Sequence, residues 1–212
     1  MKVGANQVTF LPWVGYWHRL VSADVYVDML DTQYEKGDYY NRVMVNCQWM
    51  TLPVHVKTGA RFKDVTFDTK ALKKIAKRVF QSYRREPYCK RIDPIVGLLE
   101  YWSGDNLLNL NLALRGRLAA TLGISLAHVL ESTEIGGDET ESRLWGMLKK
   151  TVPDMTHYLS GASGRSYLLS APPVPTMYQK IVKPYGGNSI LQLIAQEPDM
   201  TAAVMAAGLW EA

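Results

Sequence analysis

The chain has 212 residues, of which 47% are hydrophobic and 10% aromatic, and it carries a net charge of +4. This length predicts one large domain, or one domain with a small appendage. Its two cysteines, Cys47 and Cys89, are too few for a disulfide framework or a cysteine-based zinc site. No apolar run approaches the roughly 18–20 residues that cross a membrane. The first residues read as a strand and not as a signal peptide, so we expect a cytoplasmic protein with no membrane contact.

The N-terminal segment has the pattern of a strand–helix–strand unit. Lys2–Val8 is a short apolar run that predicts a buried strand, and Trp13–Val21 is apolar at helical spacing. Val25–Leu30 is a second apolar run. Ligands of α/β folds bind beyond the carboxyl ends of the strands, so a site is expected in the polar loop that follows. That loop contains Asp31, Gln33, Tyr34, Lys36, Asn41 and Arg42.

The remaining predicted elements follow in chain order. They are a β-hairpin region over 43–56, a strand over 62–67, helices over 69–83, 93–102 and 107–122, a strand over 124–130, a helix over 140–150, strands over 157–160 and 177–182, a helix from 188, and an Ala-rich helical tail from 201. We therefore predict an α/β fold with a strand–helix–strand N-terminal core, a mixed sheet and flanking helices. Residues 1–212 form its single domain, within which 57–91 is a basic strand/helix segment and 92–123 is helical.

Positive charge is concentrated in the basic segment 57–91. This segment holds twelve Lys or Arg and three Asp or Glu, a net charge of +9, so the rest of the chain carries −5. A basic block on an acidic body is typical of a protein that binds a polyanion. A solvated lysine face of a helix is the structural alternative. The cations expected to contact nucleic acid are Lys70, Lys73, Lys74, Lys77, Arg84 and Arg85.

The turn from Pro12 into the first predicted helix has the spacing of the HxGH signature of nucleotidylyltransferases. Trp13 and Tyr16 stand where the two histidines would be, so adenylyl transfer is not predicted. The helix N-terminus could still hold a phosphate, or the aromatic residues could simply belong to the core. His18 is a candidate for a catalytic or phosphate-contacting residue, with a buried structural role as the alternative.

The loop from Asp31 to Arg42 could carry acid–base and phosphate chemistry. Asp31 could orient or deprotonate an amine, and Arg42 could grip a phosphate through two parallel hydrogen bonds. Gln33, Tyr34 and Asn41 add polar groups for a substrate. The alternative is a polar turn in which Asp31 and Asn41 satisfy the loop backbone.

A Gly- and Ser-rich turn is predicted after the strand over 157–160. Backbone N–H groups of such a turn can surround an anion, although the spacing is not that of a P-loop and a simple tight turn is the alternative. The residues concerned are Ser160, Gly161, Gly164 and Arg165. No histidine pair has metal-site spacing and no HExxH motif occurs. We expect no dedicated metal site and no organic cofactor, and leave open a divalent cation that bridges a leaving group.

Several motifs, in order along most of the chain, resemble the WbqC-like family. They are Gln7, Leu11-Pro12-Trp13, Gly15-Tyr16, His18, Asp31, Gln33-Tyr34, Asn41-Arg42, Leu52-Pro53-Val54, Tyr158–Leu168 and Asn188-Ser189-Ile190. Two positions depart from the family pattern. Gln7 is followed by Val8 where the family usually has proline, and Asn6 stands where the family often has histidine. Asn6 cannot do the acid–base work that a histidine could do there.

The resemblance implies a transferase. Members occur in bacterial surface-polysaccharide gene clusters and among phage-type DNA-modification enzymes, and they are similar in implied chemistry: a small group, such as the amino acid glycine, is attached to an activated acceptor. Arg42, Lys57 and the Ser160–Gly164 turn would hold a phosphate or pyrophosphate leaving group. Asp31, with His18, would orient and deprotonate the amine. The acceptor would be fixed by Gln7, Gln33 and Asn41.

The spread of the basic segment favours polymeric DNA as the acceptor. We therefore expect an amino-acid:DNA transferase that acts on a pyrophosphorylated hydroxymethyl pyrimidine, as in thymidine hypermodification, in the host cytoplasm if the chain is encoded by a bacteriophage. If the base leaves the stack, Trp13 or Tyr34 could fill the gap. The partners would be DNA and a small amino acid. A nucleotide-sugar transferase of surface-polysaccharide synthesis and a non-catalytic nucleic-acid-binding module remain the alternatives, and the oligomeric state is open.

Overall fold

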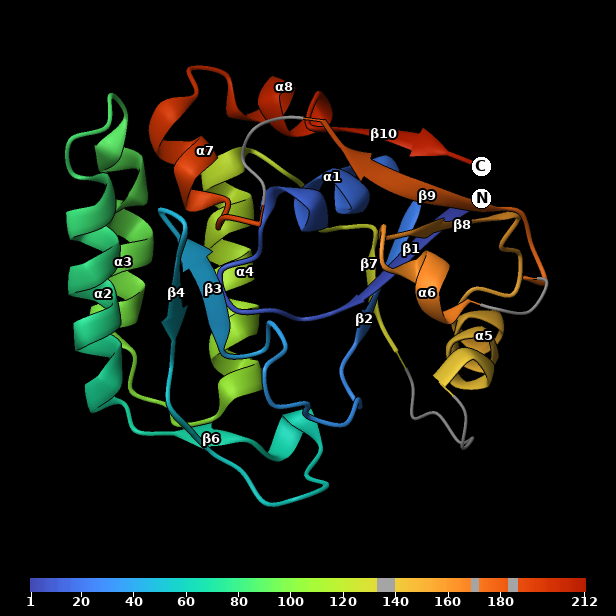
Figure 1. The fold of residues 1–212 in the computed structure, drawn as a ribbon, viewed down its shortest axis with the longest axis horizontal. Helices are drawn as coiled ribbons and strands as arrows, with labels where there is room; N and C mark the ends of the chain where they lie inside the picture. The colour runs from blue at the N-terminus through green and yellow to red at the C-terminus, as the bar shows by residue number, and fades with distance from the viewer. Residues whose placement is uncertain (133–139, 169–171, 183–186) are drawn as a thin grey trace.

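A six-stranded mixed sheet organises the protein (Figure 1). The computed structural model describes residues 1–132, 140–168, 172–182 and 187–212. The strand order is β10-β9-β8-β1-β2-β7; five strands are parallel, and β10 pairs with β9 in the antiparallel direction at one edge. The strands are β1 (Lys2–Gln7), β2 (Val25–Met29), β7 (Val129–Glu131), β8 (His157–Ser160), β9 (Thr176–Ile181) and β10 (Gly208–Glu211).

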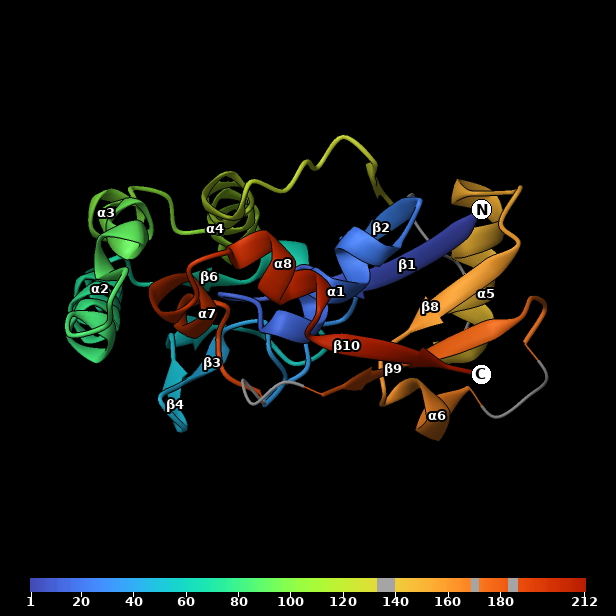
Figure 2. The same ribbon diagram turned by 90° about the horizontal axis from the view of Figure 1, so that it is seen from above.

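Helices cover both faces of this sheet. On one face Val3, Ala5 and Val27 pack against α5 (Thr140–Thr151). On the other face lie α1 (Val14–Ser22) and α8 (Met200–Met205) (Figures 1 and 2). Gly4 faces α1, and a Cβ there would lie 2.9 Å from the ring of Tyr26. The ring of Tyr26, on the neighbouring strand β2, therefore leaves little room for a side chain at this position.

The strand order reverses at β1. The chain passes from β1 through α1 to its neighbour β2, and later returns to place β8 on the opposite side of β1. A crevice between two such strands, at their carboxyl ends, is where ligands of open α/β sheets bind. In the register of β1 and β8, Gly4 pairs with Leu159, so Ser160 ends β8 opposite Ala5 and Gln7 lies two positions further along β1. This switch point fixes where a site is expected.

The segment between β2 and β7 builds the other end of the molecule (Figures 1 and 2). A polar outer face and a buried apolar stripe characterise α2, whose lysines point away from its buried residues. The N-cap of α4 is Asn106, whose Oδ1 accepts from the Asn109 N–H at 3.0 Å, and the helix ends at Gly123 with φ 69°. The segment contains β3 (Arg42–Val45), β4 (Gln48–Thr51), β5 (Val54–His55), β6 (Thr66–Phe67), α2 (Lys70–Tyr83), α3 (Asp93–Tyr101), α4 (Leu107–Leu122) and the 3₁₀ turns η1 (Phe62–Asp64) and η2 (Cys89–Ile92).

The predicted α/β class, with a mixed sheet and flanking helices, is confirmed, and three local predictions need correction. The expected strand over 62–67 is a 3₁₀ turn followed by only two strand residues, because Phe62 turns inward and is fully buried. In the expected strand over 124–130 only the last residues pair with β2. The helical tail is α8 followed by β10, which pairs with β9. Two short helices, α6 (Gly164–Tyr167) and α7 (Leu191–Gln196), complete the described elements. No helix among the described residues is both long and apolar enough to span a bilayer.

Candidate anion-binding site at the carboxyl edge of the sheet

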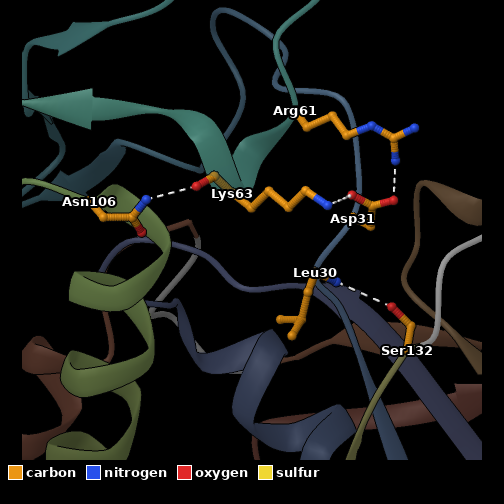
Figure 3. Close-up of polar contacts among 6 residues, drawn as sticks. All are labelled: Leu30, Asp31, Arg61, Lys63, Asn106 and Ser132. Atoms are coloured by element: carbon orange, nitrogen blue, oxygen red, sulfur yellow. Dashed lines mark hydrogen bonds and ion pairs between the residues drawn. The ribbon is translucent and has the colours of Figure 1, made fainter.

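Asp31 holds two cations beside the carboxyl end of β2 (Figure 3). One carboxylate oxygen pairs with Arg61 Nη1, and the other lies 3.0 Å from Lys63 Nζ. The Asp31 side chain is only 7% exposed, whereas those of Arg61 and Lys63 are 52% and 43% exposed. The buried carboxylate therefore fixes two cations that both reach solvent, and the three side chains together carry one net positive charge.

Buried neighbours position this trio. Phe62, between the two cations in sequence, is fully buried, and its N–H donates to the Thr32 carbonyl at 2.8 Å. The Asn106 side chain donates to the Lys63 carbonyl at 2.7 Å, which ties the Arg61–Lys63 stretch to the N-terminus of α4 (Figure 3). On the strand side, the Leu30 N–H donates to Ser132 Oγ at 3.3 Å, just after β7. Both loops are thus anchored to regular structure on each side of the site.

Two loops that the sequence treats separately lie side by side here. Gln33 forms a β-bridge with Arg61, and the Tyr34 N–H donates to the Ala60 carbonyl at 2.9 Å. The predicted polar loop after β2 is therefore joined to the start of the basic segment. Lys57 belongs to the same stretch, because the Ala60 N–H donates to its carbonyl at 3.0 Å. Within the described residues, the cations paired with Asp31 are Arg61 and Lys63.

The Gly- and Ser-rich turn lies at the switch point, at the end of β8. A Cβ on Gly164 would overlap Ser160 Oγ, and a Cβ on Gly161 would lie 2.8 Å from Arg19 Nη1. Ser160 therefore leaves no room for a side chain at position 164 in this conformation, whereas the end of the long Arg19 side chain can move away from one at position 161. The Gly164 N–H donates to the Gly161 carbonyl at 2.9 Å, which closes the turn into α6. The exposed Arg165 stacks on Tyr178, with its Cζ 4.3 Å from the ring centroid.

Comparison with known proteins identifies the family of this chain. The family model of the WbqC-like protein family matches residues 7–172, a span that includes Gln7, Asp31, both cations and the turn after β8. The chain belongs to the WbqC-like protein family. It is also similar to the uncharacterized protein Rv1507c of Mycobacterium tuberculosis, with 29% identity over 177 residues, which cover 79% of this chain and 75% of that protein. No solved structure matches it.

In this WbqC-like protein, Tyr34, Asn41 and Arg42 of the predicted polar loop contact other protein groups. The Tyr34 hydroxyl donates to Asn41 Oδ1 at 3.0 Å, and Asn41 Nδ2 donates to the Leu52 carbonyl at 2.7 Å. Burial raises the pKa of Tyr34. Arg42 lies over Trp49 of β4, with its Cζ 4.3 Å from the ring centroid. These contacts fix Asn41 just before β3 and Arg42 at its start, against Trp49 of the β3–β4 hairpin.

The first helix buries the residues that its turn motif singled out. His18 is 3% exposed, its Nδ1 accepts from Gln179 Nε2 at 2.8 Å, and its ring stacks on Trp210. Burial lowers the pKa of His18. Tyr16 is fully buried in edge contact with neighbouring aromatic rings, and Trp13 covers Gly15. The structure therefore places His18 and Tyr16 in packed interfaces between α1 and its neighbours.

Sequence reasoning missed a buried ion pair. Asp28 of β2 pairs with Arg115 of α4, and their side chains are 1% and 10% exposed. Asn111, one helical turn before Arg115, donates to the carbonyls of Tyr40 and Val8 at 2.8 and 3.4 Å. A carboxylate inside an apolar strand, and two polar residues four positions apart on an otherwise apolar helix face, were the available signals. The Asp28–Arg115 pair and the Asn111 hydrogen bonds connect α4 to β2 and to the residue after β1. They hold the helical end of the protein against the sheet.

The cations expected to bind nucleic acid are not those that pair with Asp31. Lys70, Lys73, Lys74, Lys77, Arg84 and Arg85 are all exposed on α2 and just beyond it. This helix stands at the opposite end of the molecule from β8, β9 and β10 (Figures 1 and 2). Among the residues that the structure describes, no three His, Cys, Asp or Glu side chains gather as they would around a metal ion.

Proposed function

We propose that this protein is a group transferase that binds the phosphate or pyrophosphate of an activated substrate at Arg61 and Lys63. The observation that carries the proposal is the pair of cations, each about half exposed, that buried Asp31 holds at the carboxyl edge of the sheet. A leaving group that departs as an anion needs positive charge placed in advance more than it needs a covalent intermediate. Membership of the WbqC-like family supports an activity of the transferase kind.

In its specific form the proposal is an amino-acid:DNA transferase. The neutral amine of glycine or a similar amino acid attacks the 5-methylene carbon of a pyrophosphorylated hydroxymethyl pyrimidine in DNA. A C–N bond forms, the C–O bond to pyrophosphate breaks, and pyrophosphate leaves with the bonding electron pair. The proton of the new ammonium group passes to the released pyrophosphate or to water. Because both Asp31 oxygens face cations, we assign Asp31 an orienting role instead of the expected deprotonating one.

The exposed lysines of α2 support DNA as the acceptor. A polymer can contact both the site and a distant basic helix, and phosphate contacts of this kind position a duplex without reading its sequence. We infer that α2 holds the flanking DNA, while the turn after β8, with Gln7, lines the space beside the leaving group. Binding through such contacts weakens steeply as salt rises.

Reversal of charge on α2 tests the DNA contact. The Lys73→Glu/Lys74→Glu/Lys77→Glu variant is expected to lose at least about tenfold in DNA affinity at low salt, with a smaller slope of log affinity against log salt. Fluorescence anisotropy with a labelled duplex measures both quantities. Lys149→Glu/Lys150→Glu on α5 is the matched control, because these two lysines are also exposed and helical. Unchanged affinity in the α2 variant would remove α2 from the DNA surface.

A second candidate function is favoured by the small cluster of cations beside Asp31. Among the described residues, Arg61 and Lys63 pair with Asp31, and Lys57 belongs to the adjoining stretch; this is enough charge for the diphosphate of a single nucleotide sugar. The alternative is therefore a transferase that modifies a nucleotide-linked sugar in surface-polysaccharide synthesis. In that case α2 would be a solvated face, and the activity would not depend on its charge.

Mass analysis of modified DNA tests the proposal. The protein is incubated with DNA that carries pyrophosphorylated hydroxymethyluracil and with a mixture of amino acids; the DNA is then digested and the nucleoside masses are measured. The expected result is a nucleoside that carries one amino acid, with pyrophosphate released. DNA binding without any mass change would favour a non-catalytic nucleic-acid-binding module, and neither binding nor mass change would favour the nucleotide-sugar enzyme.

A further inference from the structure

The β3–β4 hairpin carries an exposed tryptophan in contact with two other planar side chains. Trp49 is 43% exposed. The Cζ of Arg42 lies 4.3 Å from the centroid of its ring, and the Tyr39 ring centroid lies 5.7 Å away at an interplanar angle of 55°. We call Trp49, Arg42 and Tyr39 the aromatic platform. Because the two neighbours restrict the Trp49 side chain, little side-chain freedom remains to be lost when a ligand covers the exposed part of the ring.

Buried residues on the other face of the hairpin hold the platform in place. Val43 pairs with Met50 and both are buried, and side chains alternate along a strand, so Trp49 lies on the opposite face. Asn46 and Cys47 connect the two strands, both with positive φ, which is the conformation of the tightest hairpin turns. The platform is thus formed before any ligand binds.

The hairpin is bound to the basic helix α2. Asn46 Nδ2 donates to the Ser82 carbonyl at 3.1 Å, and Arg78 Nη2 donates to Gln48 Oε1 at 3.4 Å. Along the long axis of the molecule the hairpin lies between α2 and the six-stranded sheet (Figures 1 and 2).

On its other side the platform borders the polar loop that begins at Asp31. A Cβ on Gly37 of that loop would lie 3.8 Å from Arg42 Nη2. The same loop carries the carboxylate that holds Arg61 and Lys63. The platform therefore lies between the two places where the proposed function puts DNA, the α2 surface and the cation pair on Asp31.

Cations border the platform. Arg42 belongs to it, and Arg78 reaches the hairpin from α2. Lys74 is exposed one helical turn before Arg78, on the same face of α2. The acidic residue nearest to the hairpin in sequence, Asp38, accepts from the Tyr39 N–H at 2.7 Å. An exposed ring among cations is typical of surfaces that bind single-stranded nucleic acid, where rings stack on bases and cations contact phosphates.

We propose that the aromatic platform stacks on an unpaired base of the DNA strand that runs between α2 and the cation pair on Asp31. The proposal rests on the proposed function, because it takes DNA as the acceptor. It adds that the strand is single-stranded over the hairpin, since the faces of a base inside a duplex are covered by its neighbours. Gln48 and Thr51, which flank Trp49 in β4, are polar and exposed, so they do not suit the apolar centre of a protein interface.

The platform also replaces a stacking residue that the sequence favoured. Tyr34 was expected to fill the gap left by an extruded base, but it is only 8% exposed and its hydroxyl donates to Asn41. It therefore offers little ring surface to DNA. The exposed ring of Trp49 is available for stacking without any movement of the core.

Fluorescence anisotropy with a labelled single-stranded oligonucleotide, and with the duplex of the same sequence, tests the proposal. Trp49→Ala is expected to weaken binding of the single strand at least about fivefold and to leave duplex affinity unchanged. The slope of log affinity against log salt should keep its wild-type value, because no charge is removed. This constant slope distinguishes lost stacking from lost phosphate contacts.

Two further variants serve as controls. Trp49→Phe keeps an aromatic ring and is expected to retain most of the single-strand affinity, while circular dichroism checks that both Trp49 variants are folded. Tyr101→Ala removes a ring that is 86% exposed at the end of α3, outside the platform, and should change neither affinity.

The outcomes separate this proposal from the proposed function. Equal single-strand affinity in wild type and Trp49→Ala would overturn the platform and favour a protein partner for the Trp49 surface. An equal loss for single strand and duplex would also overturn it, because stacking on an unpaired base affects the single strand alone. Amino-acid transfer to DNA by the wild-type protein would show that the proposed function survives either result. Absence of binding to both forms of DNA would overturn the platform together with DNA as the acceptor.

Discussion

Replacement of Arg115 by methionine is expected to lower the free energy of unfolding by about 3–5 kcal/mol. Arg115 pairs with Asp28, whose side chain is 1% exposed, and methionine would leave a buried carboxylate without its cation. Desolvation is the larger influence on this carboxyl and raises its pKa, while the nearby Arg115 opposes that rise. Urea unfolding followed by tryptophan fluorescence at pH 7 measures the loss.

The pH dependence of the Arg115→Met variant separates this cause from a loss of packing. Without Arg115 the folded-state pKa of Asp28 rises further above its unfolded value, so the folded state binds a proton more readily than the unfolded chain. The destabilisation is therefore full above the folded pKa, and it shrinks as the pH falls toward the unfolded value of about 4. A loss that does not change with pH would indicate a packing defect.

Two control variants give reference values for the stability loss in Arg115→Met. Asp28→Leu/Arg115→Met removes both charges and is expected to recover most of the stability lost by the single variant, since a buried ion pair can often be replaced by apolar residues. Lys180→Met breaks the exposed pair between Lys180 and Glu211, in which the two side chains are 61% and 48% exposed. This change should lower the free energy of unfolding by at most about 1 kcal/mol. A loss of less than about 1 kcal/mol in Arg115→Met would contradict a structural role for the buried pair.

Removal of the cations on Asp31 is expected to abolish most of the transfer. Arg61→Ala/Lys63→Ala should reduce kcat/KM for amino-acid transfer at least about 100-fold, because loss of a single stabilising donor typically costs about 10²–10³-fold in rate. The same variant should bind pyrophosphate more weakly in a calorimetric titration. This second measurement needs no acceptor, so it reports on the anion site whichever substrate the enzyme modifies.

The controls for this variant address folding and charge separately. Arg61→Lys/Lys63→Arg keeps both charges beside Asp31 and should retain pyrophosphate binding, while circular dichroism checks that the alanine variant is folded. Lys149→Ala/Lys150→Ala removes two exposed cations from α5 and should leave transfer unchanged. Retention of more than half of the wild-type rate by Arg61→Ala/Lys63→Ala would refute the assignment. If Arg42→Ala abolished transfer instead, the leaving-group role would return to the residue that the sequence favoured.

Regular elements with a strong local pattern were predictable from the sequence. The helix predicted over 107–122 coincides with α4, because Asn106 and Gly123 mark its ends with side-chain and backbone chemistry that acts within four residues. The first two strands and α1 followed from apolar runs separated by Pro12 and Asp24. The strand β10 was missed, because four residues after an Ala-rich helix pair only with β9, about 30 positions earlier in the chain.

The site itself was predictable only in part. Asp31, Gln33 and Lys57 were singled out in the sequence, but the residues that contact them were not. Arg42 was the nearer cation in sequence, yet the β3–β4 hairpin carries it to Trp49. Arg61 lies 30 positions from Asp31 and was counted only as part of a general basic segment.

The sequence by itself determined the α/β class, the positions of most helices and strands, the concentration of positive charge and the resemblance to the WbqC-like family, because each depends on neighbours a few residues apart. Tertiary structure decided which charges meet. The Asp31–Arg61 and Asp28–Arg115 pairs join residues 30 and 87 positions apart, and His18 became a core residue only when β10 brought Trp210 against it. Such contacts depend on the order of strands in the sheet and on the path of the chain between them, and no local pattern of residues encodes either one.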